Sequence, residues 1–165
     1  MTAIREATSE DAVIIRQIAE ETWWATYSSI LEPEQIEFML NAIYEVDRLK
    51  KLIEQNSQTF ILLLEDGTPV AFAAYSPRDE NADVYKLHKL YCVPQTQGKG
   101  YGKLLIDEVA TRVKKAGKHI LELNVNRHNK AKQFYERQGF SVAYEEDIPI
   151  GPYWMNDYVM TKTLS

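Results

Sequence analysis

Three glycines at alternate positions stand between an apolar segment and an amphipathic one. Gly98, Gly100 and Gly102 remove side chains where the backbone must come close to a ligand. The free N–H groups at the start of the following helix, helped by the helix dipole, form an anion site there. Lys99 and Lys103 add positive charge. The spacing predicts a turn that holds a diphosphate, and a ligand-free strand-to-helix turn is the alternative.

Two well-known phosphate-binding loops do not fit this turn. The Walker A loop requires Ser or Thr directly after its Gly-Lys pair, and Leu104 follows Lys103 here. The dinucleotide-binding fingerprint Gly-x-Gly-x-x-Gly needs its third glycine one position later than Gly102. The turn therefore belongs to neither class.

The glycine turn and a later segment together resemble a known family. Residues 97–102 (QGKGYG) are similar to the Gln/Arg-x-x-Gly-x-Gly/Ala signature of the GCN5-related N-acetyltransferase (GNAT) superfamily, whose turn holds the pyrophosphate of CoA. Residues 121–140 (LELNVNRHNKAKQFYERQGF) resemble the strand, loop and helix that follow in that family. The resemblance covers residues 58–163 firmly and the N-terminal helices loosely. It implies an acetyl-CoA-dependent N-acetyltransferase.

The same resemblance implies a fold and a cofactor site. The fold is α/β, with a mixed, mostly antiparallel sheet, helices on both faces, and a splay for CoA between the strands ending at Val93 and Val125. Backbone groups of residues 91–93 are expected to contact the pantetheine and the thioester oxygen. Asn129 stands two residues before Ala131, where many members have three, so His128 is the alternative in its role. The implied cofactor-binding residues are Tyr91, Cys92, Val93, Gln97, Gly98, Lys99, Gly100, Tyr101, Gly102, Lys103, Asn129, Lys132 and Tyr135.

Acetyl transfer from a thioester to an amine makes three chemical demands. The amine must lose a proton, because a lysine-like ammonium has a pKa of ~10.4. The developing oxyanion needs a fixed donor, and the leaving thiolate needs a proton. The resemblance assigns the proton donor as Tyr135, whose alternative role is core packing beside Phe134. No metal is required, and the histidines show no metal-ligand spacing.

The general base is less defined by the sequence. Many members carry a glutamate on the strand before the glycine turn, but residues 86–92 (KLHKLYC) contain no carboxylate. His88 is the candidate because an imidazole titrates near neutral pH. The alternatives are a histidine without catalytic role, ordered waters, or an amine that enters neutral. Cys92 raises the option of an acetyl-cysteine intermediate, but a cysteine in an apolar strand is more often inert, so direct transfer in a ternary complex is expected.

A narrower resemblance concerns the acetyl acceptor. Residues 21–27 (ETWWATY) and 153–164 (YWMNDYVMTKTL) are similar to the PaiA-like branch, whose members acetylate polyamines such as spermidine. This implies a polyamine or another small primary amine as acceptor. The alternatives are a protein or peptide N-acetyltransferase and an inactive acetyl-CoA-binding regulator. The acceptor-binding candidates are Trp24, Tyr27 and Trp154, with Trp23 and Asp157 beside them, and core packing is the other role open to all five.

Periodicity places these residues on a set of helices and strands. Leu105, Val109 and Val113 share one helical face, and alternating apolar runs bounded by turn residues indicate strands. Helices are predicted from the Thr8 cap to about Trp24, from Pro33 towards Gln55 in one or two pieces, over Gly100–Ala116 and over Lys130–Gln138. Strands are predicted over Thr2–Ala7, Thr59–Glu65, Pro69–Tyr75, Ala82–Val93 and Ile120–Val125, with two more between Phe140 and Thr163.

Length and composition narrow the class of protein. The chain has 165 residues, which fits one domain over 1–165, and a single cysteine excludes an internal disulfide. The net charge of −5 argues against nucleic-acid binding and suits a cationic small molecule. No run is long and apolar enough for a membrane span, and the N-terminus lacks a secretion signal. A cytoplasmic location is expected, and the resemblance allows a homodimer.

Overall fold

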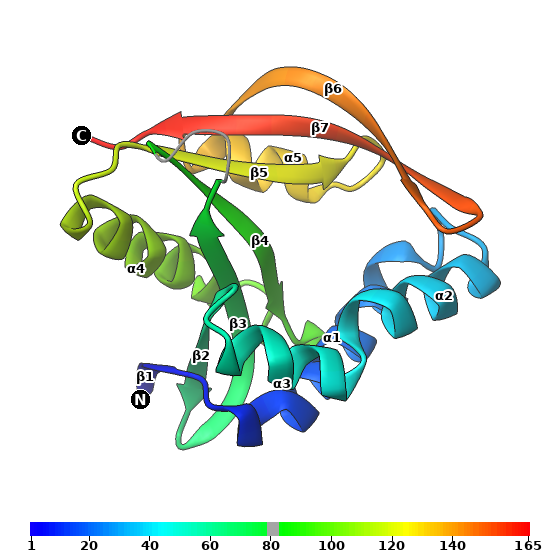
Figure 1. Ribbon diagram of the computed structural model, residues 1–165, viewed down its shortest axis with the longest axis horizontal. Helices are drawn as coiled ribbons and strands as arrows, with labels where there is room; N and C mark the ends of the chain where they lie inside the picture. Colours follow the sequence, from blue (N-terminus) through cyan, green and yellow to red (C-terminus); the bar gives the residue numbers. More distant parts are fainter. Residues whose placement is uncertain (79–82) are drawn as a thin grey trace.

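A seven-stranded sheet runs through the molecule in the order β1-β2-β3-β4-β5-β7-β6 (Figure 1). The computed structural model of the chain describes residues 1–78 and 83–165. Neighbouring strands are antiparallel, except that β4 and β5 run parallel. The predicted mixed, mostly antiparallel α/β fold is confirmed. The strands are β1 (Thr2–Glu6), β2 (Thr59–Glu65), β3 (Thr68–Pro77), β4 (Val84–Cys92), β5 (Ile120–Asn126), β6 (Ser141–Ile150) and β7 (Tyr153–Thr163).

The helices begin and end close to the residues that the sequence signals. A 3-10 turn (Ser9–Asp11) precedes the first helix, and there the Thr8 N–H donates to Asp11 Oδ2 at 2.8 Å, as in a capping box. The first helix runs to Tyr27 instead of Trp24, and the predicted strand start at Ala82 lies outside the described residues. The helices are α1 (Ala12–Tyr27), α2 (Pro33–Tyr44), α3 (Val46–Glu54), α4 (Tyr101–Lys115) and α5 (Ala131–Arg137).

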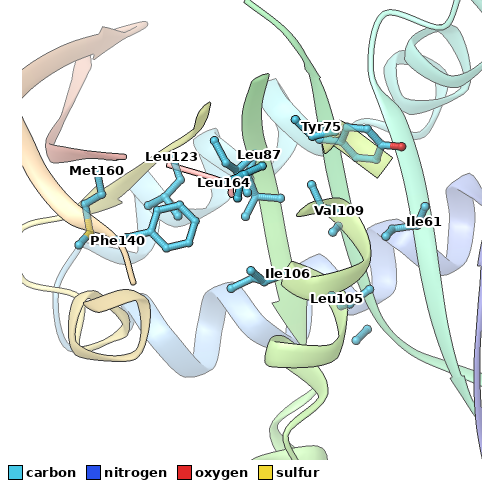
Figure 2. Close-up of a cluster of buried hydrophobic side chains, with 14 of the residues drawn as sticks. Ile61, Tyr75, Leu87, Leu105, Ile106, Val109, Leu123, Phe140, Met160 and Leu164 are labelled. Atoms are coloured by element: carbon cyan, nitrogen blue, oxygen red, sulfur yellow. The ribbon is translucent and has the colours of Figure 1, made fainter. Parts of the chain in front are cut away.

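Side chains of the central strands alternate between two apolar cores, as a pleated strand requires. On β2, Ile61 and Leu63 face a core shared with α4 and α5, whereas Phe60 and Leu62 face a core shared with α1, α2 and α3. Figure 2 shows the first core, in which buried residues of α4 lie against the strands. The helices therefore cover both faces of the sheet, as predicted.

The sheet splays at its one parallel step. The β3–β4 register shifts so that His88 is the extra residue of a β-bulge. Pairing of β4 with β5 ends at Leu87 and Leu123, although β4 continues to Cys92 and β5 to Asn126. A bulge bends its strand, which explains why the two strands part at this point. The predicted splay is confirmed, and it begins well before the strand ends.

The β6–β7 hairpin extends past the end of the splayed region and meets α2 (Figure 1). Gln35 Nε2 of α2 donates to the Trp154 carbonyl oxygen at 3.0 Å, and the Phe38 and Tyr153 rings are 5.4 Å apart. Gly151 lies in the hairpin turn with φ +57°, and a Cβ there would be 2.2 Å from Phe38 Cζ. These contacts fix the hairpin against α2. Within the described part of the chain, no helix has both the length and the apolar character to cross a membrane.

Candidate active site

A cavity of about 810 Å³ occupies the splay between β4 and β5. Its walls come from the C-terminal half of α1, from β4, from the glycine turn, from β5 and from the start of α5. The cavity thus reaches both faces of the sheet. The candidate residues that line it are His88, Tyr91, Cys92, Gln97, Gly98, Gly100, Tyr101, Gly102, Tyr27, Asn129 and Tyr135.

The glycine turn presents bare backbone to this cavity. Gly98 and Gly100 have φ +83° and +80°, a left-handed conformation that L side chains rarely adopt, and an added Cβ at either would meet open space. Gly102 has an ordinary φ, but its Cβ would lie 3.0 Å from Phe134 Cζ. Gly100 directly precedes α4, so the N-terminus of that helix opens at the cavity. This arrangement suits an anion of the size of a diphosphate.

The lysines of the turn are engaged elsewhere. Lys99 Nζ is 2.7 Å from Glu65 Oε2, and Lys103 Nζ is 2.7 Å from Asp107 Oδ2. Tyr101 also donates its hydroxyl to Glu65. Lys99 and Lys103 do not line the cavity, and an anion there would meet backbone N–H groups before it met these ammonium groups.

Tyr135 projects from α5 into the cavity between two other rings. Its centroid lies 5.3 Å from that of Phe134 and 5.9 Å from that of Phe140. Burial, reinforced by the nearby Tyr27 and Cys92, raises the pKa of the Tyr135 hydroxyl. The hydroxyl is therefore a protonated donor throughout the physiological pH range.

The end of β4 lies on the opposite wall of the cavity. Burial raises the pKa of the Cys92 thiol to about 11, so the thiolate is scarce at neutral pH. The Val93 N–H donates to the Val70 carbonyl oxygen at 2.9 Å, and Val93 does not line the cavity. Any backbone donor offered to a ligand by this segment must come from another residue.

His88 lies at the bulge with its Nε2 2.7 Å from Ser76 Oγ. Burial, with the charges of Lys89 and Lys86, lowers the pKa of His88 to about 3. The ring is therefore neutral at physiological pH and only weakly basic.

Asn129 connects α5 to α1 across the cavity. Its Oδ1 accepts from the Ala131 N–H at 2.9 Å, which is the predicted capping role at the start of α5. The buried Tyr27 hydroxyl lies beside the Asn129 side chain, and burial raises the pKa of Tyr27 well above its usual value. His128, the alternative to Asn129, lines the cavity as well.

Besides Val93, Lys99 and Lys103, the candidates that do not line the cavity are Trp23 and Asp157, which are buried, and Trp24, Trp154 and Lys132. Trp24 is 36% exposed and Trp154 57% exposed on the surface. Lys132 Nζ lies 3.6 Å from Glu136 Oε2 and 5.2 Å from the centre of the Tyr158 ring. The structure therefore does not bring the Trp24, Trp154 and Lys132 side chains to the other candidates.

Sequence reasoning missed several polar residues that line the cavity, and two of them lie on the splayed strands β4 and β5. Lys89 is 6% exposed, and its Nζ donates to Gln58 Oε1 at 2.7 Å and lies over the Phe60 and Tyr44 rings. Burial, with Arg48 and Lys86 nearby, lowers the pKa of Lys89 to about 7. The second residue is Asn124, whose polar side chain interrupts an apolar strand pattern. A charged or amide residue in such a strand was the signal that could have identified both.

Across residues 1–78 and 83–165, no group of His, Cys, Asp and Glu side chains is arranged to hold a metal ion.

Comparison with known proteins agrees with this geometry. Residues 27–151 match the family described as acetyltransferase (GNAT) domain. A spermidine N(1)-acetyltransferase of Thermoplasma acidophilum is 31% identical over 163 residues, which cover 96% of this chain and 95% of that protein. An uncharacterized N-acetyltransferase of Mycobacterium bovis is 27% identical over 155 residues, 93% of this chain and 98% of its own. The crystal structure of a PaiA N-acetyltransferase from T. acidophilum in complex with coenzyme A superposes with a TM-score of 0.85 and 28% identity over 99% of both chains.

Proposed function

Because this chain belongs to the GNAT acetyltransferase family, we propose that it binds acetyl-CoA in the splay between β4 and β5 and transfers the acetyl group directly to a polyamine or a similar small primary amine. The N-acetyltransferase activity follows from the family, and the acceptor and the residue roles are the proposal. Residues 1–165 are taken to act as one catalytic domain. The cytoplasmic location and the homodimer stay predictions from the sequence.

The observation that carries the proposal is the pair of left-handed glycines at the cavity. Gly98 and Gly100 leave open space where any other residue would place a Cβ, and the start of α4 lies directly behind them. A diphosphate fits there through backbone N–H groups and the helix dipole. The PaiA structure, a neighbour over 99% of both chains, was determined with coenzyme A. These facts support acetyl-CoA as the donor substrate.

The proposed chemistry uses Tyr135 as the proton donor. The amine nitrogen forms a bond to the thioester carbon, the carbon–sulfur bond breaks, and the departing sulfur takes the proton of the Tyr135 hydroxyl. The raised pKa keeps the Tyr135 hydroxyl protonated until the carbon–sulfur bond breaks. The nitrogen loses a proton as the amide forms, and that proton returns through water to the Tyr135 oxygen, so the products are the acetylated amine, CoA with its free thiol, and the enzyme in its starting state.

Cys92, the candidate for an acetyl-cysteine intermediate, and His88, the candidate general base, are poorly suited to these roles. A Cys92 thiol with a pKa of about 11 is a poor nucleophile at neutral pH, which supports direct transfer without an acetyl-cysteine. A His88 imidazole with a pKa of about 3 is a weak base, which supports loss of the amine proton to water or entry of the amine in its neutral form.

The acceptor is proposed from a relative and from charge. The 31% identical relative is named for acetylating spermidine, and it covers almost all of this chain. The net charge of −5 favours the approach of a polycation. A peptide acceptor is the second candidate because the cavity reaches both faces of the sheet.

The test is thiol release from acetyl-CoA with a panel of amines. Spermidine, spermine, amino acids, aminoglycosides and short peptides with free N-termini are compared at equal concentration, with acetylated products identified by mass spectrometry. Acetylated polyamine at the highest rate is the expected result. Thiol release with peptides alone would mean that the acceptor is a protein N-terminus and not a polyamine. Tight acetyl-CoA binding with no acetylated amine would replace the enzyme by a regulator.

A further inference from the structure

Two carboxylates lie next to Asn124 on the face of the sheet that α1 covers: Asp157, which is buried, and Glu146, which is exposed at the surface. Asn124 lines the cavity, and its Nδ2 donates to Glu146 Oε1 at 3.1 Å and to Asp157 Oδ2 at 3.3 Å. Its strand neighbours Leu123 and Val125 belong to the α4 core, so the Asn124 side chain points to the opposite face, where α1 lies. The three residues come from the adjacent strands β5, β6 and β7. A single neutral amide group is thus shared between two negative charges.

Asp157 is poorly satisfied for a buried carboxylate. It is 6% exposed, and its Oδ1 is buried without a hydrogen-bond partner in the described part of the chain. Burial raises the pKa of Asp157, and the nearby Glu146 raises it further. Such a group costs stability unless a cation compensates it.

The protein's own cations compensate this pair only in part. Arg127 donates through Nε to the Asp157 carbonyl oxygen and through Nη2 to Asp147 Oδ1 at 2.7 Å, so its charge is directed to another carboxylate. Lys86 lowers the pKa of Asp157 through space, but among residues 1–78 and 83–165 it makes no ion pair with Asp157 or Glu146. The site therefore retains excess negative charge beside the cavity.

We propose that Asp157 and Glu146 form an ammonium subsite that binds a second, unreacting amine of the acceptor, with Asn124 positioning the two carboxylates. The Asn124 nitrogen marks a point within hydrogen-bond distance of both carboxylates, and a cationic donor beside it is a stronger partner than the neutral amide. This inference rests on the proposed function and narrows it, because it selects diamines and polyamines over monoamines. A purely structural role is disfavoured by the buried Oδ1 that has no partner.

The test compares Asp157→Asn and Glu146→Gln with the control Glu145→Gln. Glu145 precedes Glu146 on β6 and is exposed as Glu146 is, but strand alternation points its side chain to the other face. Spermidine and butylamine serve as acceptors of high and single charge. Loss of one charged partner is expected to raise the spermidine KM about 10- to 100-fold, with the butylamine KM and the kcat values near wild type. Equal losses with both acceptors, or an unchanged spermidine KM, would overturn the subsite.

Two further readouts separate this inference from a structural role and from the proposed function. Asp157→Asn should not lower the melting temperature at pH 7, because the folded state raises the pKa of Asp157 and so disfavours its charged form. A lower melting temperature, together with loss of acetylation of both spermidine and butylamine, would mean that Asp157 is a structural residue and would overturn the proposal. Calorimetric binding of spermidine to the CoA-bound protein needs no turnover. If Asp157→Asn weakens spermidine binding, the subsite is supported even if the wild type acetylates nothing. If Asp157→Asn binds and acetylates spermidine as the wild type does, the subsite is rejected and the proposed function stands.

Discussion

At the scale of single residues, Tyr135 and Lys89 show how burial sets the chemistry of a side chain. Both line the cavity, and in both burial favours the neutral form at neutral pH. Tyr135 was found in the sequence because the resemblance marked it. Lys89 was not. Its place in an apolar strand is a signal, but that signal does not show whether the amine is buried, because the partners Gln58 and Phe60 lie just before and at the start of β2.

Replacement of Tyr135 by Phe is expected to lower kcat about 100-fold, because the departing sulfur loses its proton donor. The KM for acetyl-CoA and the melting temperature should change little, since the contacts with the Phe134 and Phe140 rings remain. Steady-state kinetics across the pH range measures this. Tyr144→Phe is the matched control, because Tyr144 is 48% exposed on β6. A Tyr135→Phe enzyme with full kcat at every pH would remove Tyr135 from the mechanism.

Lys89 makes the stability of the protein depend on pH. Its pKa is about 7 in the folded protein and 10.5 without burial, so between these values the unfolded chain binds more protons. The free energy of unfolding should therefore rise with pH in that interval, by up to about 1.4 kcal/mol per pH unit. Below pH 7 the buried ammonium carries the whole cost, about 5 kcal/mol for the gap between the two pKa values.

Denaturant unfolding of wild type and Lys89→Met at pH 6, 7, 8 and 9 measures this effect. The variant should be the more stable protein at pH 6 and should lose most of the rise above pH 7. Lys115→Met, which changes an exposed lysine at the end of α4, should keep the wild-type slope. Parallel curves for Lys89→Met and wild type would mean that Lys89 is not a buried neutral amine.

At the scale of elements, the glycine turn and the β4 bulge were not equally predictable. The turn is a local motif whose glycines and helix start are adjacent in the sequence, so its conformation can be inferred from spacing. The bulge at His88 depends on which residues of β3 lie opposite β4. Cross-strand register is not encoded within one strand, and for this reason the sequence did not reveal where the splay begins.

Gly98→Ala and Gly100→Ala are expected to weaken CoA binding at least about tenfold, because the added Cβ occupies the space in which the diphosphate approaches the backbone. The left-handed backbone costs each variant about 1–2 kcal/mol of stability. Gly117→Ala is the control. Gly117 has φ +81° with open space around a Cβ, as at Gly98 and Gly100, but it ends α4 and does not line the cavity. All three variants should lose similar stability, and only the first two should lose CoA affinity in a calorimetric titration. Equal CoA affinity in all three would show that the turn does not hold the ligand.

At the scale of the whole molecule, the cavity joins the two apolar cores. Its wall contains Leu123 and Val125 of the α4 core and Tyr27 of the α1 core. The fold class could be predicted because local patterns and the resemblance agreed on it. The meeting of Asn124, Glu146 and Asp157 could not, because it depends on the strand order β5-β7-β6, which brings together segments distant in the chain.

Ligand binding across this cavity should stabilise the folded protein as a whole. Free CoA at about 100 times its Kd adds about 2.7 kcal/mol to the free energy of unfolding. For a chain of 165 residues this corresponds to a rise in melting temperature of about 5–10 °C. A thermal melt with and without CoA measures it, and Gly98→Ala should need a proportionally higher CoA concentration for the same shift. An unchanged melting temperature at millimolar CoA would contradict binding in the splay.

The most direct test of the central claim is a two-substrate initial-velocity experiment with acetyl-CoA and spermidine, followed by thiol release. Direct transfer requires both substrates in the cavity at once, so double-reciprocal plots at several fixed spermidine concentrations should give intersecting lines, and Cys92→Ala should retain the pattern. Parallel lines that disappear in Cys92→Ala would indicate an acetyl-cysteine, and absence of spermidine-dependent thiol release would contradict acetyl transfer to this acceptor.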